Sequence, residues 1–200
     1  PGSALKPFVY ELAMEKLDLV PSSVLPDVDT SFPGPDGASF RPKNYDDTFH
    51  GPVLLRDALG SSFNVPAVHV AERLGTAAVL ERLRAVGLAS LDRGGMWRPV
   101  RATLQSPPGE PVRVLDARST YLVTHVLADP GARLASFGDD SVLEMPFEAA
   151  VKTGTSKGYR DNVAVGFTPE VTVAVWVGNF DGSPMRGVSE LGNLPSCARS

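Results

Sequence analysis

Three short motifs constrain how this chain can fold, because each lies on a different kind of predicted element and they follow one another in a fixed order. They are Ser3-Ala4-Leu5-Lys6, Ser62-Phe63-Asn64 and Lys152-Thr153-Gly154-Thr155. The first falls at the predicted start of a helix, the second between two predicted helices and the third on a predicted strand. The chain is therefore expected to place helices before a sheet.

The first two thirds of the chain carry helical patterns. In residues 4–18 apolar side chains recur three and four positions apart, which predicts an amphipathic helix capped by Ser3. Helical periodicity returns in residues 53–61 and 66–87. Asp116 is expected to cap a further helix that ends near Ala128.

Two segments lack a helical pattern. Residues 21–52 are rich in Pro, Gly, Asp and Ser, which predicts a long irregular surface segment. Residues 88–115 show no sustained period, with a weak strand expected at 100–104 opposite 112–114.

The last third changes to strand patterns. Residues 149–155, 162–168 and 171–177 are predicted strands, with a turn at 168–170 between the last two. Helices followed by such strands indicate an α+β fold, a helical cluster plus a small antiparallel sheet.

Composition excludes several classes of function. A net charge of -4 and a pI near 5.4 offer no basic surface for nucleic acid. No stretch approaches about 18 consecutive apolar residues, so no span of a membrane is expected within this sequence. The single Cys197 excludes an internal disulfide, and the three histidines lack metal-ligand spacing. Neither a metal nor an organic cofactor is expected.

The first motif has the residue types of an activated nucleophile. A serine hydroxyl is a weak nucleophile until a base takes its proton, and Ser3 and Lys6 share one face of a helix start. Burial disfavours the charged form of a lysine, so Lys6 could accept that proton. The alternative is an ordinary serine cap with an exposed lysine one turn later.

The second and third motifs supply a relay and a binding strand. Ser62 would pass a proton from Lys6 to a leaving amine, and Asn64 would hydrogen-bond a substrate peptide; both could instead be helix caps. A strand carrying Lys152, Thr153, Gly154 and Thr155 could pair with an extended peptide, with a cation and hydroxyls for a carboxylate. The backbone N–H groups of Ser3 and Thr155 would form an oxyanion hole. The alternative is a turn or an edge-strand charge.

These residues resemble the transpeptidase domain of the class A, bifunctional penicillin-binding proteins, most closely the 1C type. The resemblance extends beyond the three motifs, over most of residues 1–87 and 113–188. Further matching stretches are Phe40-Arg41-Pro42-Lys43-Asn44-Tyr45-Asp46, Phe49-His50-Gly51-Pro52-Val53, Arg56-Asp57-Ala58-Leu59, Asn64-Val65-Pro66-Ala67-Val68, Arg160-Asp161-Asn162 and Val175-Trp176-Val177-Gly178-Asn179.

The resemblance implies a D,D-transpeptidase of peptidoglycan synthesis. Ser3 would be acylated by the D-Ala-D-Ala end of a stem peptide, or by a penicillin, and a neighbouring amine or water would accept the acyl group. A serine β-lactamase shares the motifs but needs a deacylating glutamate. Glu72, Glu81, Glu110, Glu144 and Glu148 do not stand in a Glu-x-x-Leu-Asn setting. A catalytically impaired module that binds β-lactams is a further alternative.

The resemblance also implies a partial domain, with a transpeptidase/β-lactamase-like fold incomplete at both ends. Residues 1–188 would form the domain, starting at the active-site helix, with an internal deletion near 88–97 and a loose tail at 189–200. The parent protein would be anchored in the bacterial inner membrane, with this domain on the periplasmic face and a glycosyltransferase domain upstream.

Overall fold

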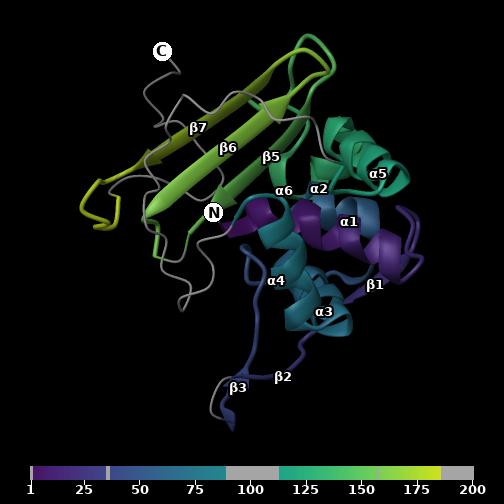
Figure 1. The fold of residues 1–200 in the computed structure, drawn as a ribbon. Coiled ribbons are helices and arrows are strands. Elements are labelled where there is room, and N and C mark those ends of the chain that lie inside the picture. Colours follow the sequence, from purple (N-terminus) through teal and green to yellow (C-terminus); the bar gives the residue numbers. More distant parts are fainter. Residues whose placement is uncertain (1, 35–36, 89–112, 157, 186–200) are drawn as a thin grey trace.

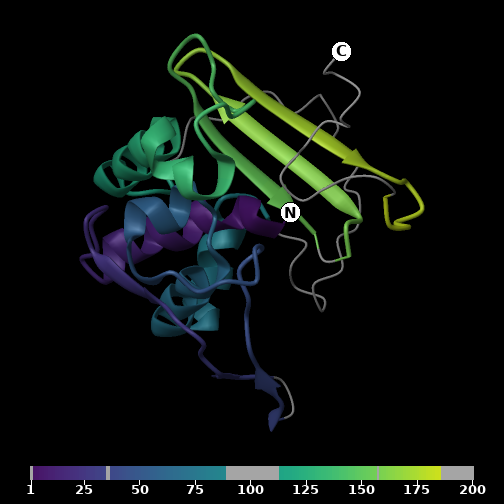
Figure 2. The ribbon, with the colours of Figure 1, turned by 180° about the vertical axis from the view of Figure 1, so that it is seen from behind.

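The computed structural model describes residues 2–34, 37–88, 113–156 and 158–185. A cluster of helices packs against one face of a three-stranded antiparallel sheet, as Figure 1 and the reverse view in Figure 2 show. The predicted α+β arrangement is confirmed.

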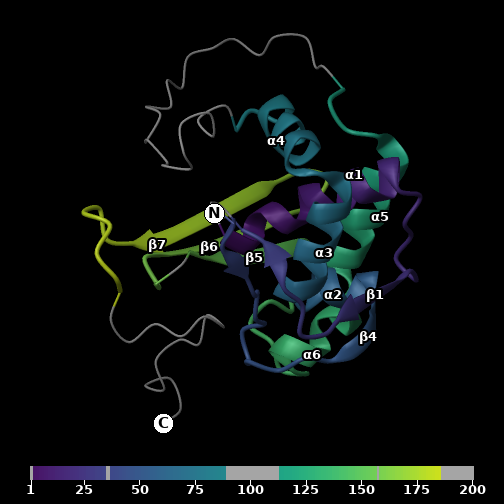
Figure 3. The same ribbon diagram turned by 90° about the horizontal axis from the view of Figure 1, so that it is seen from below.

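Helix α1 (Lys6–Lys16) is the central helix of the cluster. It follows a 3-10 turn, η1 (Gly2–Leu5), and six consecutive residues from Val9 to Met14 are buried. Helices α3, α4 and α5 pack around it (Figure 3). The helix is confirmed, but the prediction that it is amphipathic is wrong, because neighbouring helices cover α1 on several sides. Ser3 lies in the 3-10 turn and does not cap α1, whose N-cap is Leu5.

The helices predicted after residue 53 are confirmed. They are α2 (Leu55–Gly60), α3 (Asn64–Leu74) and α4 (Thr76–Ala85). Gly75 separates α3 from α4 with a φ of 79°, a conformation that glycine adopts without strain. The fully buried side chains of Leu55, Leu59 and Val70 belong to the main core cluster.

The segment predicted to be irregular contains two short strand pairs. Strand β1 (Val24–Asp27) pairs antiparallel with β4 (Gly51–Leu54), and β2 (Phe32–Pro33) pairs with β3 (Ser39–Phe40). Pro26 stands opposite Pro52, so the two residues without an N–H share one position of the ladder. The strands were not predicted, because prolines are typical of irregular segments.

Helix α5 (Ala117–Ala128) begins as predicted, because the Asp116 carboxylate accepts a hydrogen bond from the Ser119 N–H at 2.8 Å. A second 3-10 turn, η4 (Pro130–Arg133), and the short helix α6 (Leu134–Phe137) follow. Gly60 lets α2 approach η4 closely, since a Cβ there would collide with the Ala132 carbonyl. Neither η4 nor α6 was predicted.

The sheet agrees with the predicted strands to within one or two residues. Its order is β5–β6–β7, formed by β5 (Ala150–Thr155), β6 (Asp161–Phe167) and β7 (Thr172–Gly178). Three predictions lie wholly or almost wholly outside the described residues: the deletion near 88–97, the weak strand at 100–104 and the loose tail at 189–200. Within the described ranges, no helix is long and apolar enough to cross a membrane.

Candidate active site

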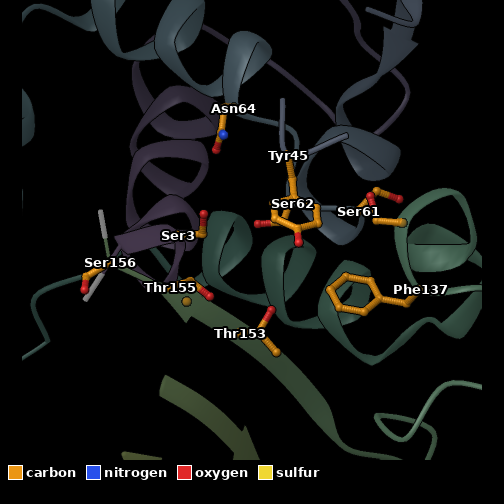
Figure 4. A pocket seen from close by; sticks show the side chains of 11 residues that line it. Ser3, Tyr45, Ser61, Ser62, Asn64, Phe137, Thr153, Thr155 and Ser156 are labelled. Carbon is orange, nitrogen blue, oxygen red and sulfur yellow. The ribbon is translucent and has the colours of Figure 1, made fainter. Parts of the chain in front are cut away.

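A cavity of about 250 Å³ opens where three segments that are distant in sequence meet. We call η1 together with the α2–α3 junction its helical wall, and β5 its strand wall. In Figure 4, Ser3 lies between Asn64 on the helical wall and Thr155 on the strand wall. The lining residues are Ser3, Tyr45, Ser61, Ser62, Asn64, Ser136, Phe137, Thr153, Gly154, Thr155 and Ser156.

The contact between the two walls depends on Gly2. Its φ is 55°, and a Cβ at this position would collide with the carbonyl oxygen of Thr155. Glycine is favoured here for both reasons. The close approach brings Ser3 to the end of β5.

Lys6 is buried and bound to the second motif. Its Nζ donates to the Ser62 carbonyl at 2.5 Å and to Asn64 Oδ1 at 2.6 Å, and lies 3.4 Å from Ser62 Oγ. Burial, and to a smaller extent the charge of Lys152, lowers the pKa of Lys6 well below its ordinary value. Within the described residues Lys6 makes no hydrogen bond to Ser3, although the spacing predicted that the two are within reach.

Lys152 reaches the same serine from the strand wall. Its Nζ donates to Ser62 Oγ at 2.9 Å and to the Thr153 carbonyl at 2.7 Å. Burial lowers the pKa of Lys152 to about 7. In the described part of the chain neither buried lysine forms an ion pair, so no carboxylate offsets the cost of burying their charges.

Ser62 lies between the two lysines in an unusual backbone conformation. Its φ is 61°, in the left-handed region that a serine seldom adopts. Such strain persists only where the surrounding structure enforces it, and it is common at functional sites.

The structure thus brings together the predicted site residues of the three motifs. Ser3, Ser62, Asn64, Thr153, Gly154 and Thr155 line the cavity, and the two lysines lie beneath it. The Thr155 hydroxyl donates to Asn162 Oδ1 on β6 at 2.9 Å. Among the described residues no group of three or more His, Cys, Asp or Glu side chains is placed to hold a metal ion.

Sequence reasoning missed five residues of the lining: Tyr45, Ser61, Ser136, Phe137 and Ser156. Ser156 directly follows the third motif, and Tyr45 lies in a stretch that carries the family resemblance. Ser136 and Phe137 belong to α6, which no sequence signal predicted.

Comparison with known proteins agrees with this geometry. A family model described as "Penicillin binding protein transpeptidase domain" matches residues 1–96. Penicillin-binding protein 1C of Escherichia coli (strain K12) is 33% identical over 216 residues, which cover 94% of this chain and 27% of that protein. Penicillin-binding protein 1A of Neisseria meningitidis serogroup A is 27% identical over 226 residues, covering 90% of this chain and 28% of that protein.

Solved structures show the same fold. Penicillin-binding protein 1A from Haemophilus influenzae superposes with a TM-score of 0.70 at 21% identity, over 96% of this chain and 40% of that one. The penicillin-binding protein PonA1 from Mycobacterium tuberculosis gives a TM-score of 0.65 at 19% identity, over 96% and 63% of the two chains.

The chain belongs to the transpeptidase domain family of the class A penicillin-binding proteins. Its similarity to penicillin-binding protein 1C, at 33% identity, agrees with the 1C resemblance of its motifs. It spans about a quarter of the length of these two curated relatives.

Proposed function

We propose that this chain carries the catalytic site of a serine D,D-transpeptidase that cross-links peptidoglycan stem peptides. Ser3 is the nucleophile, Lys6 its base and Ser62 the proton relay. Asn64, Lys152, Thr153, Gly154 and Thr155 bind the donor peptide. The observation that carries the proposal is the convergence of two buried lysines on Ser62, beside the cavity that Ser3 lines.

The contacts of Lys6 suit a neutral amine. Such an amine has two N–H bonds and one lone pair, and the two short contacts, to Ser62 O and Asn64 Oδ1, use both N–H bonds. The lone pair is then free to accept a proton. Burial lowers the pKa of Lys6 well below its ordinary value, which favours this neutral state.

In the acylation step Ser3 Oγ attacks the carbonyl carbon of the penultimate D-Ala, and its proton passes to Lys6. The negative charge on the carbonyl oxygen is stabilised by the N–H groups of Ser3 and Thr155. The C–N bond then breaks, and the terminal D-Ala leaves with a proton delivered through Ser62. An ester on Ser3 remains.

In the second step an amine of a neighbouring stem peptide attacks this ester. Its proton returns by the same relay to Ser3 Oγ, and the new amide is the cross-link. With water as the acceptor, the same site acts as a D,D-carboxypeptidase. A penicillin acylates Ser3 in the same way, but its opened ring remains attached to the acyl group.

The strand wall suits an extended donor peptide. Among the described strands β5 pairs with β6 alone and lies at the edge of the sheet, a position at which an extended peptide could add as a further strand. Thr153 and Thr155 line the cavity, and their hydroxyls would bind the terminal carboxylate. Lys152, when charged, adds positive potential.

A transpeptidase is favoured over a serine β-lactamase. Deacylation by a class A β-lactamase needs a glutamate at the site. Among the described residues no glutamate lines the cavity.

We further infer that the domain works in the cell envelope, on the periplasmic face of the inner membrane. There peptidoglycan stem peptides are its substrates and β-lactams its inhibitors. This rests on the kinship with penicillin-binding proteins 1C and 1A. The parent protein would be anchored in the membrane and would carry a glycosyltransferase domain upstream. The transpeptidase domain would extend over residues 1–188.

Intact mass after incubation with a penicillin tests the proposal. The chain should gain the mass of one penicillin, and the Ser3→Ala variant should gain none. Ser136→Ala is the matched control, because Ser136 lines the same cavity and is expected to leave the adduct intact. No adduct on the folded chain would contradict the proposal. An adduct without turnover of a D-Ala-D-Ala peptide would instead indicate a β-lactam-binding module.

A further inference from the structure

We propose that Asn44, held by Asp27 and His50, is a positioning residue that fixes the Ser62-Phe63-Asn64 motif against the two lysines. The inference rests on the proposed function for its catalytic consequence. None of the three residues lines the cavity. They act on it through the backbone and side chains of the second motif.

Asn44 is only 4% exposed, and its amide is fully engaged. Its Oδ1 accepts from the Asn64 N–H at 2.8 Å and from the Val65 N–H at 3.3 Å. These are the first N–H groups of α3, which have no partner within the helix. Asn44 therefore caps α3 from a distant segment at the point where the motif lies.

The other side of the amide fixes Asn44 itself. Its Nδ2 donates to both carboxylate oxygens of Asp27 at 2.8 Å and to the Thr48 carbonyl at 2.9 Å. With these donors on one side, the oxygen of the amide must face α3. The orientation of the cap is thus set by Asp27.

Asp27 connects this cap to a second contact with the motif. The carboxylate is fully buried and also accepts from the His50 N–H at 3.0 Å, with His50 Nδ1 at 2.6 Å. The His50 ring stacks on Phe63, with centroids 4.2 Å apart and planes 15° apart. The network therefore holds two consecutive residues of the motif, Phe63 by stacking and Asn64 by its N–H.

The neighbour of Asn44 orients the Asn64 side chain. Asn64 Nδ2 donates to the Lys43 carbonyl at 2.8 Å, which leaves Oδ1 for Lys6. The same segment thus sets the helix start and the acceptor that contacts Lys6.

The position of Ser62 explains why such support matters. Its left-handed φ of 61° is unfavourable for serine, so the residues that follow must hold it. Without the cap, Ser62 and Asn64 are expected to relax away from Lys6 and Lys152. A displacement of about 1 Å at a catalytic group can cost about 100-fold in rate.

The test measures penicillin acylation of the whole chain, separating the rate constant at saturation from the half-saturating concentration. Asn44→Ala should lower the rate constant about 10- to 100-fold, the effect typical of hydrogen-bond partners behind a reactive site. Asn44→Asp should lower the rate constant at least as much, because its carboxylate would lie against that of Asp27 and repel it. Adding Asp27→Asn to it should regain part of the rate, because the new amide at position 27 can donate to the new carboxylate at position 44.

Ser119→Ala is the control for a loss of stability alone. Ser119 is buried, and its hydroxyl donates at 3.0 Å to the carboxylate of Asp116, which caps α5 away from the second motif. It should lower the melting temperature but not the acylation rate of folded protein. If Asn44→Ala does not fold, His50→Ala takes its place, because His50 is partly exposed. It should cost about 10-fold in rate by the same reasoning.

Amide hydrogen exchange at Asn64 and Val65 separates this inference from the proposed function. Faster exchange at these two groups in Asn44→Ala is expected whether or not the chain is acylated. Unchanged exchange, or a wild-type acylation rate in the folded variant, would overturn the inference. Absence of an adduct on the unsubstituted chain would instead overturn the proposed function, and the exchange result would still judge the cap.

Discussion

The two walls of the cavity are held in different ways. The helical wall rests on a core in which Tyr10, Leu55 and Leu59 are fully buried. The strand wall belongs to a sheet whose far strand, β7, leaves Val173, Val175 and Val177 more than half exposed. Packing on several sides fixes the first wall. The second wall is fixed by pairing with β6 on one edge and by the packing of α5 and η1 against β5, while the far strand β7 stays exposed.

The two buried lysines show the same contrast. Lys6 contacts three atoms of the α2–α3 junction, so its position follows from the helical packing. Lys152 contacts its own neighbour Thr153 and, on the helical wall, Ser62 Oγ. The hydroxyl of Ser62 is thus the point where the two walls exchange a hydrogen bond. Lys6 is therefore held by the packing of the helices, and Lys152 by its position on β5.

The largest effect should come from removing the base on the helical wall. Lys6→Met keeps the length of the side chain but has no amine to accept the proton of Ser3. General-base catalysis typically contributes about 10²- to 10⁴-fold, so the acylation rate should fall by that factor. Stopped-flow measurement with a fluorescent penicillin would record it.

Lys16→Met is the matched control, because Lys16 lies in the last turn of the same helix with an exposed side chain. Its acylation rate should equal that of the unsubstituted chain. A normal rate in Lys6→Met would mean that another group takes the proton.

The next effect concerns pH and the strand wall. The pKa of Lys152 is about 7 in the folded chain against 10.5 for a free lysine, so the unfolded chain binds more protons between these values. Stability should therefore rise with pH from about 7 to 10, with a slope of up to about 1.4 kcal/mol per pH unit from this group. Urea unfolding at several pH values measures it.

Lys152→Met should flatten this slope, while Lys16→Met should retain it. The lowered pKa of Lys6 acts in the same direction, so some slope remains in Lys152→Met. An unchanged slope in that variant would show that Lys152 stays protonated in the folded chain.

The smallest effect should distinguish the helical core behind the first wall from the sheet behind the second by one matched substitution. Val70→Thr places a hydroxyl at a fully buried position of α3 and should cost about 1–3 kcal/mol of unfolding free energy. Val175→Thr makes the same change at a β7 side chain that is 52% exposed, and should stay within about 0.5 kcal/mol. Urea denaturation compares the two. Equal losses would show that the β7 face is covered in solution.

Local signals predicted many of the elements correctly. The strands β5, β6 and β7 were found because alternating apolar residues and a turn specify them within a few positions. The α5 cap was found because Asp116 and Ser119 are close in sequence. The strands β1 and β4 were missed, because their pairing joins segments about 25 residues apart and their prolines are typical of loops.

The sequence by itself determined the three motifs, their order and the kind of element under each, because these depend on residue type and short-range spacing. Tertiary structure decided that Lys6 faces Ser62 and Asn64, that Lys152 meets Ser62 from the other side, and that Asn44 caps α3. Those contacts join residues 20 to 90 positions apart. They arise from the packing of whole helices against the sheet, which no local pattern encodes.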